Sequence, residues 1–467
     1  MKSTLVRAAR LAVAAGILTS PLSAQDWSRF RGPNGSGIST ESGFPTVFEA
    51  AVNGLWRTPV RPGKSSPVLS RRHVFLVGFE DGKFYTQCFD RATGRLLWER
   101  AEPRPRRAPE HRYNEPDVFF KDIGLISYDA EGRRRWEVPL GPFSNHMGVA
   151  TSPILADGLL ILQIDQSAGS FLAAYSPETG REVWRASRPE GDSWATPLRA
   201  DLGGRPVLLT AGGGWFGAHG LRDGSRLWSE PGMGPAVVAS PVIASGTVFG
   251  FGYGYEAPVP FGPTLEKYDA SGDGELSAEE FDEDAWLQVS KELGDGKPPV
   301  TSDEWDAAFR RISTPSAILA VRVQPDPSAG GAVGSRVLWR VERSMIGVVP
   351  SPLVLDRIVY IVRNGGILTS FDAETGEQLK MGRLAPALGS YSASPVAAGG
   401  RLYFASEDGQ MTVVKAGRTW EILAMSDLGE PIYATPALSA GRVFLRAGAH
   451  LYAFGSETRR TEHHERP

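Results

Sequence analysis

Short apolar runs recur along the chain, and a Ser-Pro or Thr-Pro pair precedes each of them. The seven pairs are Ser66-Pro67, Ser152-Pro153, Thr196-Pro197, Ser240-Pro241, Ser351-Pro352, Ser394-Pro395 and Thr435-Pro436. Four of the six intervals between successive prolines are 41–44 residues, the length of one four-stranded propeller blade. Proline also suits the first residue of a strand, because its missing N–H removes no hydrogen bond there. The pattern therefore predicts an all-β chain of repeated four-stranded units.

The two remaining intervals are longer and change the count of units. The interval of 86 residues is twice 43, which indicates one lost start, and the interval of 111 residues indicates an insertion. Seven starts and one lost start predict an eight-bladed β-propeller of four-stranded blades. A small α-helical insertion then falls in the fifth blade. We divide the chain into a leader (1–24), two propeller parts (25–253 and 315–455), the insertion (254–314) and a polar tail (456–467).

A second signature is a turn that ends in Gly and has a Trp or Lys four residues later. The pairs are Gly94/Trp98, Gly132/Trp136, Gly180/Trp184, Gly224/Trp228 and Gly376/Lys380. Gly supplies the positive φ of a tight hairpin turn, and the Trp that opens the next strand can lie against the neighbouring blade. The segment Asn53–Trp56 resembles the end of such a unit but precedes the first start. We therefore predict that an N-terminal strand completes the last blade and removes two open edges.

These repeats resemble those of the pyrroloquinoline-quinone (PQQ) type β-propellers. The strongest likeness is to the bacterial quinone-binding-like repeat proteins that share a scaffold with the outer-membrane assembly factor BamB. The opening Asp26–Pro33 is also similar to the start of many exported members, and the resemblance covers roughly residues 27–454. It implies the fold far more firmly than any activity. The second unit departs from the pattern: it lacks its innermost strand, or takes it from the loop Pro103–Pro109.

The insertion carries a pattern typical of a calcium site. Residues 269–280 match the EF-hand loop of twelve residues, with Gly274 at the sharp turn. The predicted ligands are Asp269, Ser271, Asp273, the backbone carbonyl of Glu275, a water held by Ser277, and both carboxylate oxygens of Glu280. The alternative is an acidic surface turn. The segment Leu293–Glu304 reads as a degenerate, metal-free partner loop that packs through Trp305 and Phe309. Since only three side-chain carboxylates are present, we expect a weak affinity, ~10⁻⁵ to 10⁻³ M.

The first residues have the order of a secretory signal. Lys2, Arg7 and Arg10 precede the apolar run Leu11–Leu18, and small residues at Leu22–Ala24 predict cleavage after Ala24. We expect a periplasmic or secreted protein. It would not be a lipoprotein, because no Cys stands at the cleavage site, and no stretch is long enough to span a bilayer. The charge is nearly balanced, with 50 Lys+Arg and 53 Asp+Glu, so nucleic acid is not an expected partner.

The sequence gives little support for catalysis. The resemblance implies that the family's dehydrogenases hold the quinone in the central funnel, under a disulfide between adjacent cysteines. This chain has one cysteine, Cys88, and no CxxCH haem motif, so we do not expect PQQ as a cofactor. We predict a non-enzymatic scaffold that binds a protein, peptide or carbohydrate, with calcium as its cofactor. The alternative is a PQQ-dependent or other oxidoreductase of this fold.

Residues just before the Ser/Thr-Pro pairs should line one mouth of the ring. They include Asn145, His146, Trp194, Tyr391 and Tyr433. Aromatic rings with a few polar groups at a concave mouth are typical of a ligand or peptide site. The equally weighted alternative is that these side chains only plug the funnel. A lone histidine such as His146 is more often a surface or hydrogen-bonded residue than a metal ligand.

Overall fold

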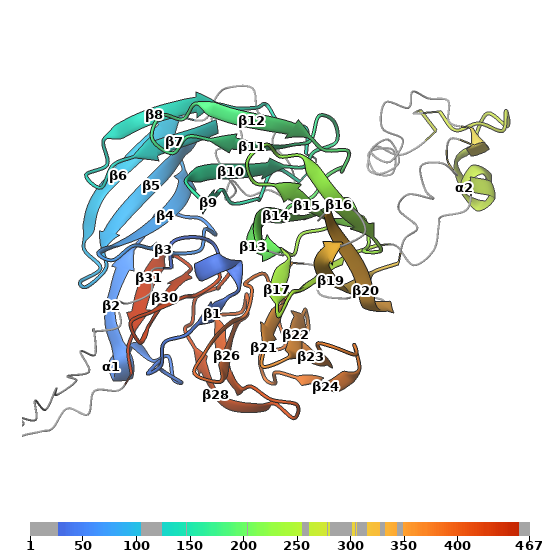
Figure 1. The fold of residues 1–467 in the computed structure, drawn as a ribbon. Helices are drawn as coiled ribbons and strands as arrows, with labels where there is room; N and C mark the ends of the chain where they lie inside the picture. The colour runs from blue at the N-terminus through green and yellow to red at the C-terminus, as the bar shows by residue number, and fades with distance from the viewer. Residues whose placement is uncertain are drawn as a thin grey trace, which may run out of the picture.

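In a computed structural model, the β-sheets of the protein are arranged around a common axis (Figure 1). The structure describes residues 27–103, 124–145, 147–202, 204–254, 261–277, 279–280, 301–303, 305, 315–326, 332–342 and 349–456. The predicted signal peptide therefore lies outside the described residues, as does nearly all of the polar tail. No helix in the described part of the chain is long and apolar enough to cross a bilayer.

The described residues form seven blades, named A to G here, and one two-stranded sheet. Blades A, B and C are consecutive antiparallel sheets, apart from the two-stranded sheet that follows blade A. Their strands are β3 (Val68–Leu69), β4 (His73–Glu80), β5 (Lys83–Asp90) and β6 (Leu96–Pro103) in blade A, β9 (Ile154–Ala156), β10 (Leu159–Ile164), β11 (Phe171–Tyr175) and β12 (Glu182–Ser187) in blade B, and β13 (Leu198–Leu202), β14 (Arg205–Gly212), β15 (Trp215–Gly220) and β16 (Arg226–Pro231) in blade C. The two-stranded sheet contains β7 (Gly124–Tyr128) and β8 (Arg134–Pro139).

Blades D to G complete the ring, and N-terminal strands join the last two of them. The strands are β17 (Val242–Ala244), β18 (Thr247–Gly252), β19 (Ala317–Asp326) and β20 (Ala332–Glu342) in blade D, β21 (Leu353–Leu355), β22 (Ile358–Arg363), β23 (Ile367–Asp372) and β24 (Gln378–Arg383) in blade E, β1 (Ile38–Ser39), β25 (Val396–Ala398), β26 (Arg401–Ala405), β27 (Gln410–Lys415) and β28 (Glu421–Asp427) in blade F, and β2 (Gly54–Pro59), β29 (Ala437–Ser439), β30 (Arg442–Ala447) and β31 (His450–Phe454) in blade G. The helices are α1 (Ala50–Asn53), α2 (Phe261–Tyr268) and a 3₁₀ turn, η1 (Pro33–Gly35).

The prediction of eight four-stranded blades is wrong, because the described residues form seven. The Ser/Thr-Pro starts link these seven blades in order, since the backbone N–H of each start donates to the hydroxyl of the next. The links are Ser152 to Thr196, Thr196 to Ser240, Ser240 to Ser351, Ser351 to Ser394, Ser394 to Thr435, and Thr435 to Ser66, at 2.9–3.0 Å. No such link joins Ser66 to Ser152 among the described residues. At that break the described chain provides only the outer hairpin β7–β8, and residues 104–109 of the loop proposed as a substitute lie outside the described residues.

The repeated turn and its Trp join neighbouring sheets, as predicted. Indole N–H groups donate to carbonyls in the turn of the next unit, from Trp98 to Ala130 at 2.8 Å, and from Trp339 to Ala373 at 3.0 Å. The turn glycine allows the close approach, because a Cβ at Gly132 would lie 2.6 Å from the Trp98 ring. Trp98 docks on the hairpin β7–β8 in this way, so the hairpin follows blade A around the ring.

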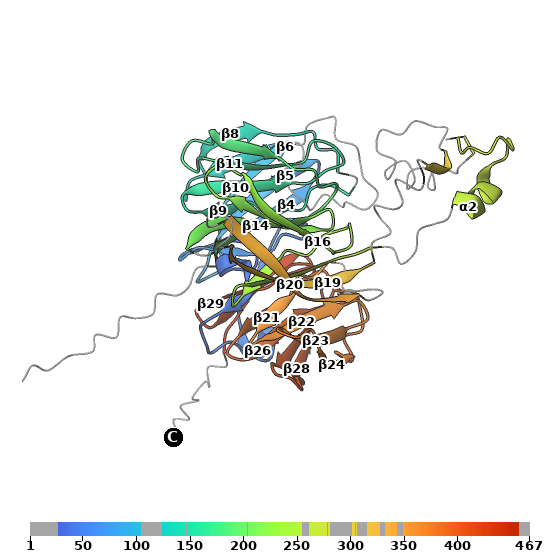
Figure 2. The ribbon, with the colours of Figure 1, turned by 45° about the vertical axis from the view of Figure 1, so that its right-hand side comes forward.

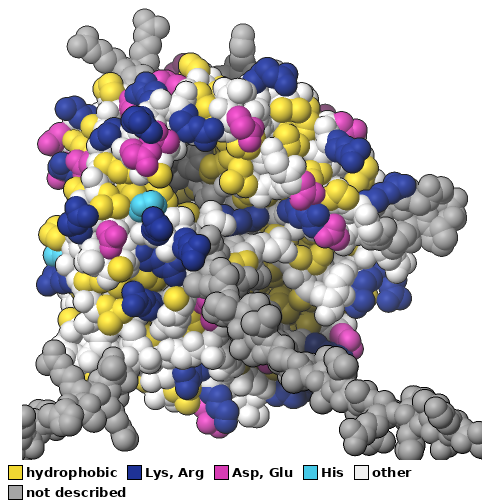
Figure 3. All heavy atoms as spheres, turned by 60° about the vertical axis from the view of Figure 1, so that its left-hand side comes forward, with side chains coloured by type: hydrophobic (Ala, Val, Ile, Leu, Met, Phe, Trp, Pro, Cys, Tyr) yellow, Lys and Arg dark blue, Asp and Glu magenta, His cyan; other side chains and the backbone are white. Residues whose placement is uncertain are grey.

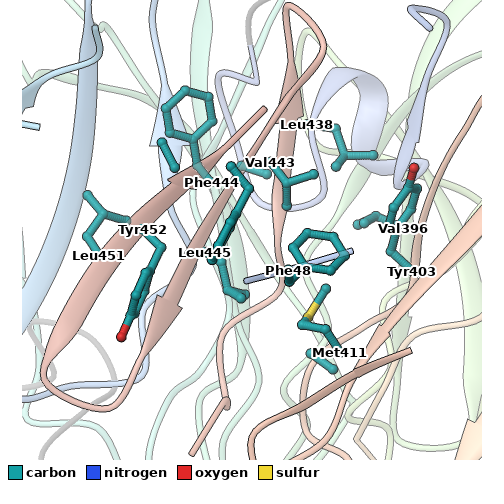
Figure 4. Packing of buried hydrophobic residues seen from close by; sticks show 14 of the residues in the cluster. Phe48, Val396, Tyr403, Met411, Leu438, Val443, Phe444, Leu445, Leu451 and Tyr452 are labelled. Carbon is teal, nitrogen blue, oxygen red and sulfur yellow. The ribbon is translucent and has the colours of Figure 1, made fainter. Parts of the chain in front are cut away.

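The predicted closure of the ring by an N-terminal strand is confirmed. Strand β2 pairs antiparallel with β31, and Trp56 lies opposite Ala453. The core at this junction holds Phe48 against two rings in edge-to-face geometry, with centroids 6.2 Å from Tyr403 and 5.3 Å from Phe454 (Figure 4). Residues from both ends of the described chain are therefore buried together, which ties the N-terminal segment to the last two blades.

The insertion interrupts blade D between β18 and β19, and helix α2 lies outside the ring of blades (Figures 1 and 2). Its Leu276 and Trp305 are 0% and 1% exposed. The Trp305 ring lies 5.9 Å from that of Phe261, between centroids. Most of the degenerate loop and Phe309 lie outside the described residues, so the predicted packing of that loop is not tested beyond Trp305.

Candidate functional site

The loop at 269–280 follows directly from helix α2. The two carboxylate oxygens of Asp269 accept backbone N–H bonds from Gly272 at 2.6 Å and Gly274 at 3.0 Å. Asp273 accepts the N–H of Glu275 at 2.9 Å. Gly272 and Gly274 have φ angles of +75° and +81°, a backbone conformation that residues with a Cβ rarely adopt. The loop thus folds back on its first carboxylate.

Glu280 closes this loop from its far end. One carboxylate oxygen accepts the N–H of Ser271 at 3.0 Å, and the other accepts the N–H of Ser277 at 2.8 Å and its hydroxyl at 3.0 Å. These N–H bonds, that of Ser277 first, lower the pKa of Glu280 to about 2. In the described residues no three His, Cys, Asp or Glu side chains gather closely enough to hold a metal ion. The carboxylates of Asp269, Asp273 and Glu280 instead accept hydrogen bonds from the backbone of the loop.

The predicted funnel residues differ in their surroundings. His146 lies outside the described residues. Trp194 is 9% exposed and its indole N–H donates to the carbonyl of Gly148 at 2.6 Å, while Tyr391 is 2% exposed and its hydroxyl donates to that of Ala387 at 2.9 Å. Tyr433 is half-buried, with the Lys64 ammonium 4.8 Å from its ring centroid. Trp194 and Tyr391 are therefore packed inside the protein, and Tyr433 is the more accessible ring.

The N-terminal segment 27–39 lies inside the ring, which sequence reasoning missed. Figure 1 shows η1 and β1 in blue at the centre of the blades. The segment bonds to the inner strands of four blades, with the carbonyl of Trp27 accepting from Leu69 at 2.8 Å, Arg29 donating to the carbonyl of Pro197 at 3.1 Å, Arg31 donating to that of Pro352 at 2.7 Å, and the carbonyl of Gly37 accepting from Ala397 at 2.8 Å. The chain's own residues thus cross the propeller axis. The only sequence signal was the family likeness of the opening Asp26–Pro33.

A buried network of charges joins blades B and C. The side chains of Arg188 and Asp165 are each 1% exposed, and their bonds measure 2.6 Å (Nε to Oδ1) and 3.2 Å (Nη2 to Oδ2). The amide of Gln163 also donates to Asp165 at 2.6 Å. Glu190, 4% exposed at its side chain, pairs with Arg226 and lies 3.6 Å from Arg188 Nε. Two arginines and two carboxylates therefore balance their charges within the interface.

His219 completes this network as a neutral side chain. Arg188 Nη1 lies 3.3 Å from His219 Nε2, and His219 Nδ1 lies 3.1 Å from the carbonyl of Gly224. A carbonyl can only accept, so Nδ1 carries the proton and Nε2 accepts from Arg188. Burial, and next the charge of Arg188, lower the pKa of His219 to about 4. Sequence reasoning missed the network because its members come from separate repeats.

The lowered pKa of His219 predicts acid sensitivity. As the pH falls from about 6.5 to about 4, the unfolded chain protonates this residue while the folded protein does not, so stability is lost. The loss from this residue should be roughly 3 kcal/mol across that interval. Urea unfolding at about pH 7 and about pH 4.5 should show a smaller loss for His219→Gln than for the unchanged protein. Equal losses would show that His219 is not the group that titrates.

A pocket of about 400 Å³ lies between blade A and the hairpin β7–β8. Figure 3 shows the side of the ring that carries blade A. Three aromatic rings follow one another along it, with centroids 6.1 Å apart for Phe75 and Trp98, and 5.9 Å apart for Trp98 and Tyr128. The remaining lining residues are Ser70, His73, Thr86, Asp129 and Ala130. The pocket therefore lies at the junction of blade A with the hairpin β7–β8.

Comparison with known proteins agrees with this architecture. The family model described as outer membrane protein assembly factor BamB matches residues 87–259. The crystal structure of BamB from Moraxella catarrhalis is similar at a TM-score of 0.54 and 12% identity, covering 86% of this chain and 99% of BamB. The designed protein Ika8 gives a TM-score of 0.52 at 13% identity, covering 88% and 100%. A europium-containing methanol dehydrogenase reaches only 0.42 at 12% identity, covering 92% and 98%.

No curated protein matches the sequence. At these identities the structural matches speak for the fold alone. The matched repeats, the Trp that docks on the turn of the next unit and the ring closed by β2 nevertheless agree with one another. The chain is a β-propeller similar in fold to BamB, and its residues 87–259 match the BamB family model.

Proposed function

We propose that the protein is an exported, non-enzymatic propeller that binds a protein, peptide or carbohydrate partner and carries calcium in its insertion. The axial segment 27–39 carries this proposal. It bonds to the inner strands of four blades, so protein occupies the place in which the related dehydrogenases are expected to hold a quinone. The likeness to BamB, whose family model is described as an assembly factor, supports a binding role in the cell envelope.

The cysteine supports the same proposal. Cys88 is fully buried, and burial, followed by the charge of Asp90, raises the pKa of its thiol to about 12. A thiol of this kind is neither a redox partner nor a nucleophile near neutral pH. Neither electron transfer through a disulfide nor thiol catalysis is therefore available from this residue.

Calcium at residues 269–280 is part of the proposal and rests on the chemical type of the donors in this loop. Asp269, Asp273 and Glu280 supply carboxylate oxygens, the donor type that calcium prefers. Glu280 already reaches the backbone at both Ser271 and Ser277, and so spans the loop that an ion would draw together. When bound, calcium would supply a structural clip for the insertion rather than a reacting group.

The decisive test of the scaffold role is the addition of PQQ with calcium. We expect no quinone absorbance retained after gel filtration and no dye reduction with alcohols or aldoses. A retained quinone that turns over substrate would overturn the non-enzymatic proposal in favour of an oxidoreductase.

A partner should be sought at the accessible mouth. Capture from a native envelope fraction should retain a partner with the unchanged protein and lose it with the Lys64→Ala/Tyr433→Ala double variant. Leu96→Ala is the control, because Leu96 is 43% exposed on the outer strand β6. Equal capture by all three proteins would contradict binding at the mouth.

A further inference from the structure

Two arginines of the axial segment, Arg29 and Arg31, lie among the inner strands, and their charge balance is unusual among the described residues. Neither Arg29 nor Arg31 makes an ion pair in the part of the chain that the structure describes. Their printed hydrogen bonds all go to backbone carbonyls: Arg29 Nη2 donates to Pro197, and Arg31 Nη2 donates to Pro352 at 2.7 Å and to Ser36 at 3.3 Å. A carbonyl satisfies a donor but leaves the positive charge uncompensated. Arg188, in the buried network between blades B and C, faces the carboxylate of Asp165 instead.

Several of their donors are also unused. Arg31 is 1% exposed, and its Nε and Nη1 have no hydrogen-bond partner among the residues that the structure describes. The buried Nε of Arg29 has none either. Buried donors and charges are normally paired, and each exception in a native fold calls for an explanation. Here three guanidinium nitrogens remain without a partner on one short segment.

The two guanidinium groups are close enough to affect each other. Burial lowers the pKa of Arg31 to about 9, and the charge of Arg29 is the second cause. Burial lowers the pKa of Arg29 to about 10. Both groups remain cationic near neutral pH, so the propeller axis carries two like charges in a region of low dielectric constant.

We propose that Arg29 and Arg31 form an oxyanion site on the propeller axis, for a ligand with a phosphate or carboxylate group. The planar fork of a guanidinium matches the oxygens of both groups, and a negative charge between the two arginines would relieve their repulsion. Arg29 is only partly buried, so the ligand approaches from its side and the shielded Arg31 lies behind. This site requires neither the quinone nor the calcium discussed above.

The test uses the full mature chain in calcium-free buffer at constant ionic strength, with sodium chloride as the reference salt. Inorganic phosphate and acetate are titrated separately by calorimetry, and thermal unfolding is followed at each concentration. We expect a saturable heat and a saturable rise in Tm with at least one of them. Binding of phosphate alone would indicate a ligand with a phosphate group, and binding of acetate alone would indicate a ligand with a carboxylate group. Binding of both would indicate that the site accepts either oxyanion.

Variants separate this site from general salt effects. Arg29→Gln should weaken binding by about tenfold or more, because it removes one positive charge and one planar guanidinium group with its paired N–H donors. Arg31→Lys keeps the charge but loses the fork, and should also weaken binding. Arg199→Gln is the control, since Arg199 pairs at the surface with Asp157 and Asp201 and should leave the affinity unchanged. If Arg31→Lys does not fold, Arg29→Gln decides.

Two results would overturn the proposal. One is the absence of any heat or Tm rise beyond that of chloride. The other is an affinity for phosphate or acetate that Arg29→Gln leaves as it was. Either would mean that the arginines serve only to hold proline carbonyls at the starts of the inner strands.

Discussion

Replacing Arg188 with Ala is expected to lower the free energy of unfolding by about 3–5 kcal/mol. The substitution would leave Asp165 buried without its counter-charge, with a side chain only 1% exposed, and would remove the charge near Glu190. Removal of one partner of a buried pair costs more than the pair itself contributes, because the remaining ion is desolvated and unpaired. Urea unfolding near neutral pH measures the change through the midpoint and its slope.

Two variants bracket this result. Arg199→Ala removes a surface ion pair with Asp157 and Asp201, and should cost less than about 1 kcal/mol. The double variant Arg188→Met/Asp165→Leu removes both buried charges, and should recover a large part of the loss. An Arg188→Ala protein as stable as Arg199→Ala would show that the charges of this interface are solvated in the folded protein.

Glu280→Gln is expected to weaken calcium binding by more than about tenfold. The substitution keeps the size of the side chain but leaves one oxygen and no charge at the position that closes the loop. Asp269→Ala should act nearly as strongly, since Asp269 stands at the first predicted ligand position and its oxygens accept the N–H groups of Gly272 and Gly274. Calorimetry at millimolar calcium measures both.

Asp303→Ala is the matched control, because Asp303 is an exposed carboxylate in the degenerate loop and should not alter binding. Calcium that binds only the folded protein should also stabilise it, by about 2.7 kcal/mol at a hundredfold excess over Kd. The protection should be local to residues 265–308, because the blades do not depend on the ion. No calcium heat, or equal heat for Glu280→Gln, would reduce the loop to an acidic turn.

The sequence by itself determined the features that each repeat needs locally. A Ser/Thr-Pro start, a Gly turn and a Trp four residues later specify strands and hairpins within about forty residues, so they could be identified without a structure. The closure of the ring by β2 could also be predicted, because Asn53–Trp56 resembles the last strand of a repeat unit whose earlier strands do not precede it in the sequence. The proposed calcium ligands could be named for the same reason, as they lie within one loop of twelve residues, and calcium binding there stays a prediction.

Only the tertiary structure decided which units became blades and what fills the axis. The repeat spacing predicts a unit wherever the Gly turn is present, but a blade requires all four of its strands. The unit that contains β7 and β8 has only these two strands among the described residues. Arg31 meets Pro352 across 321 residues, and His219 meets Arg188 from a different repeat. No local pattern encodes such contacts, because they form only when the ring has closed and brought inner strands and neighbouring blades together. The seven-bladed ring and the arginines on its axis therefore follow from long-range packing, which the period of the repeats does not contain.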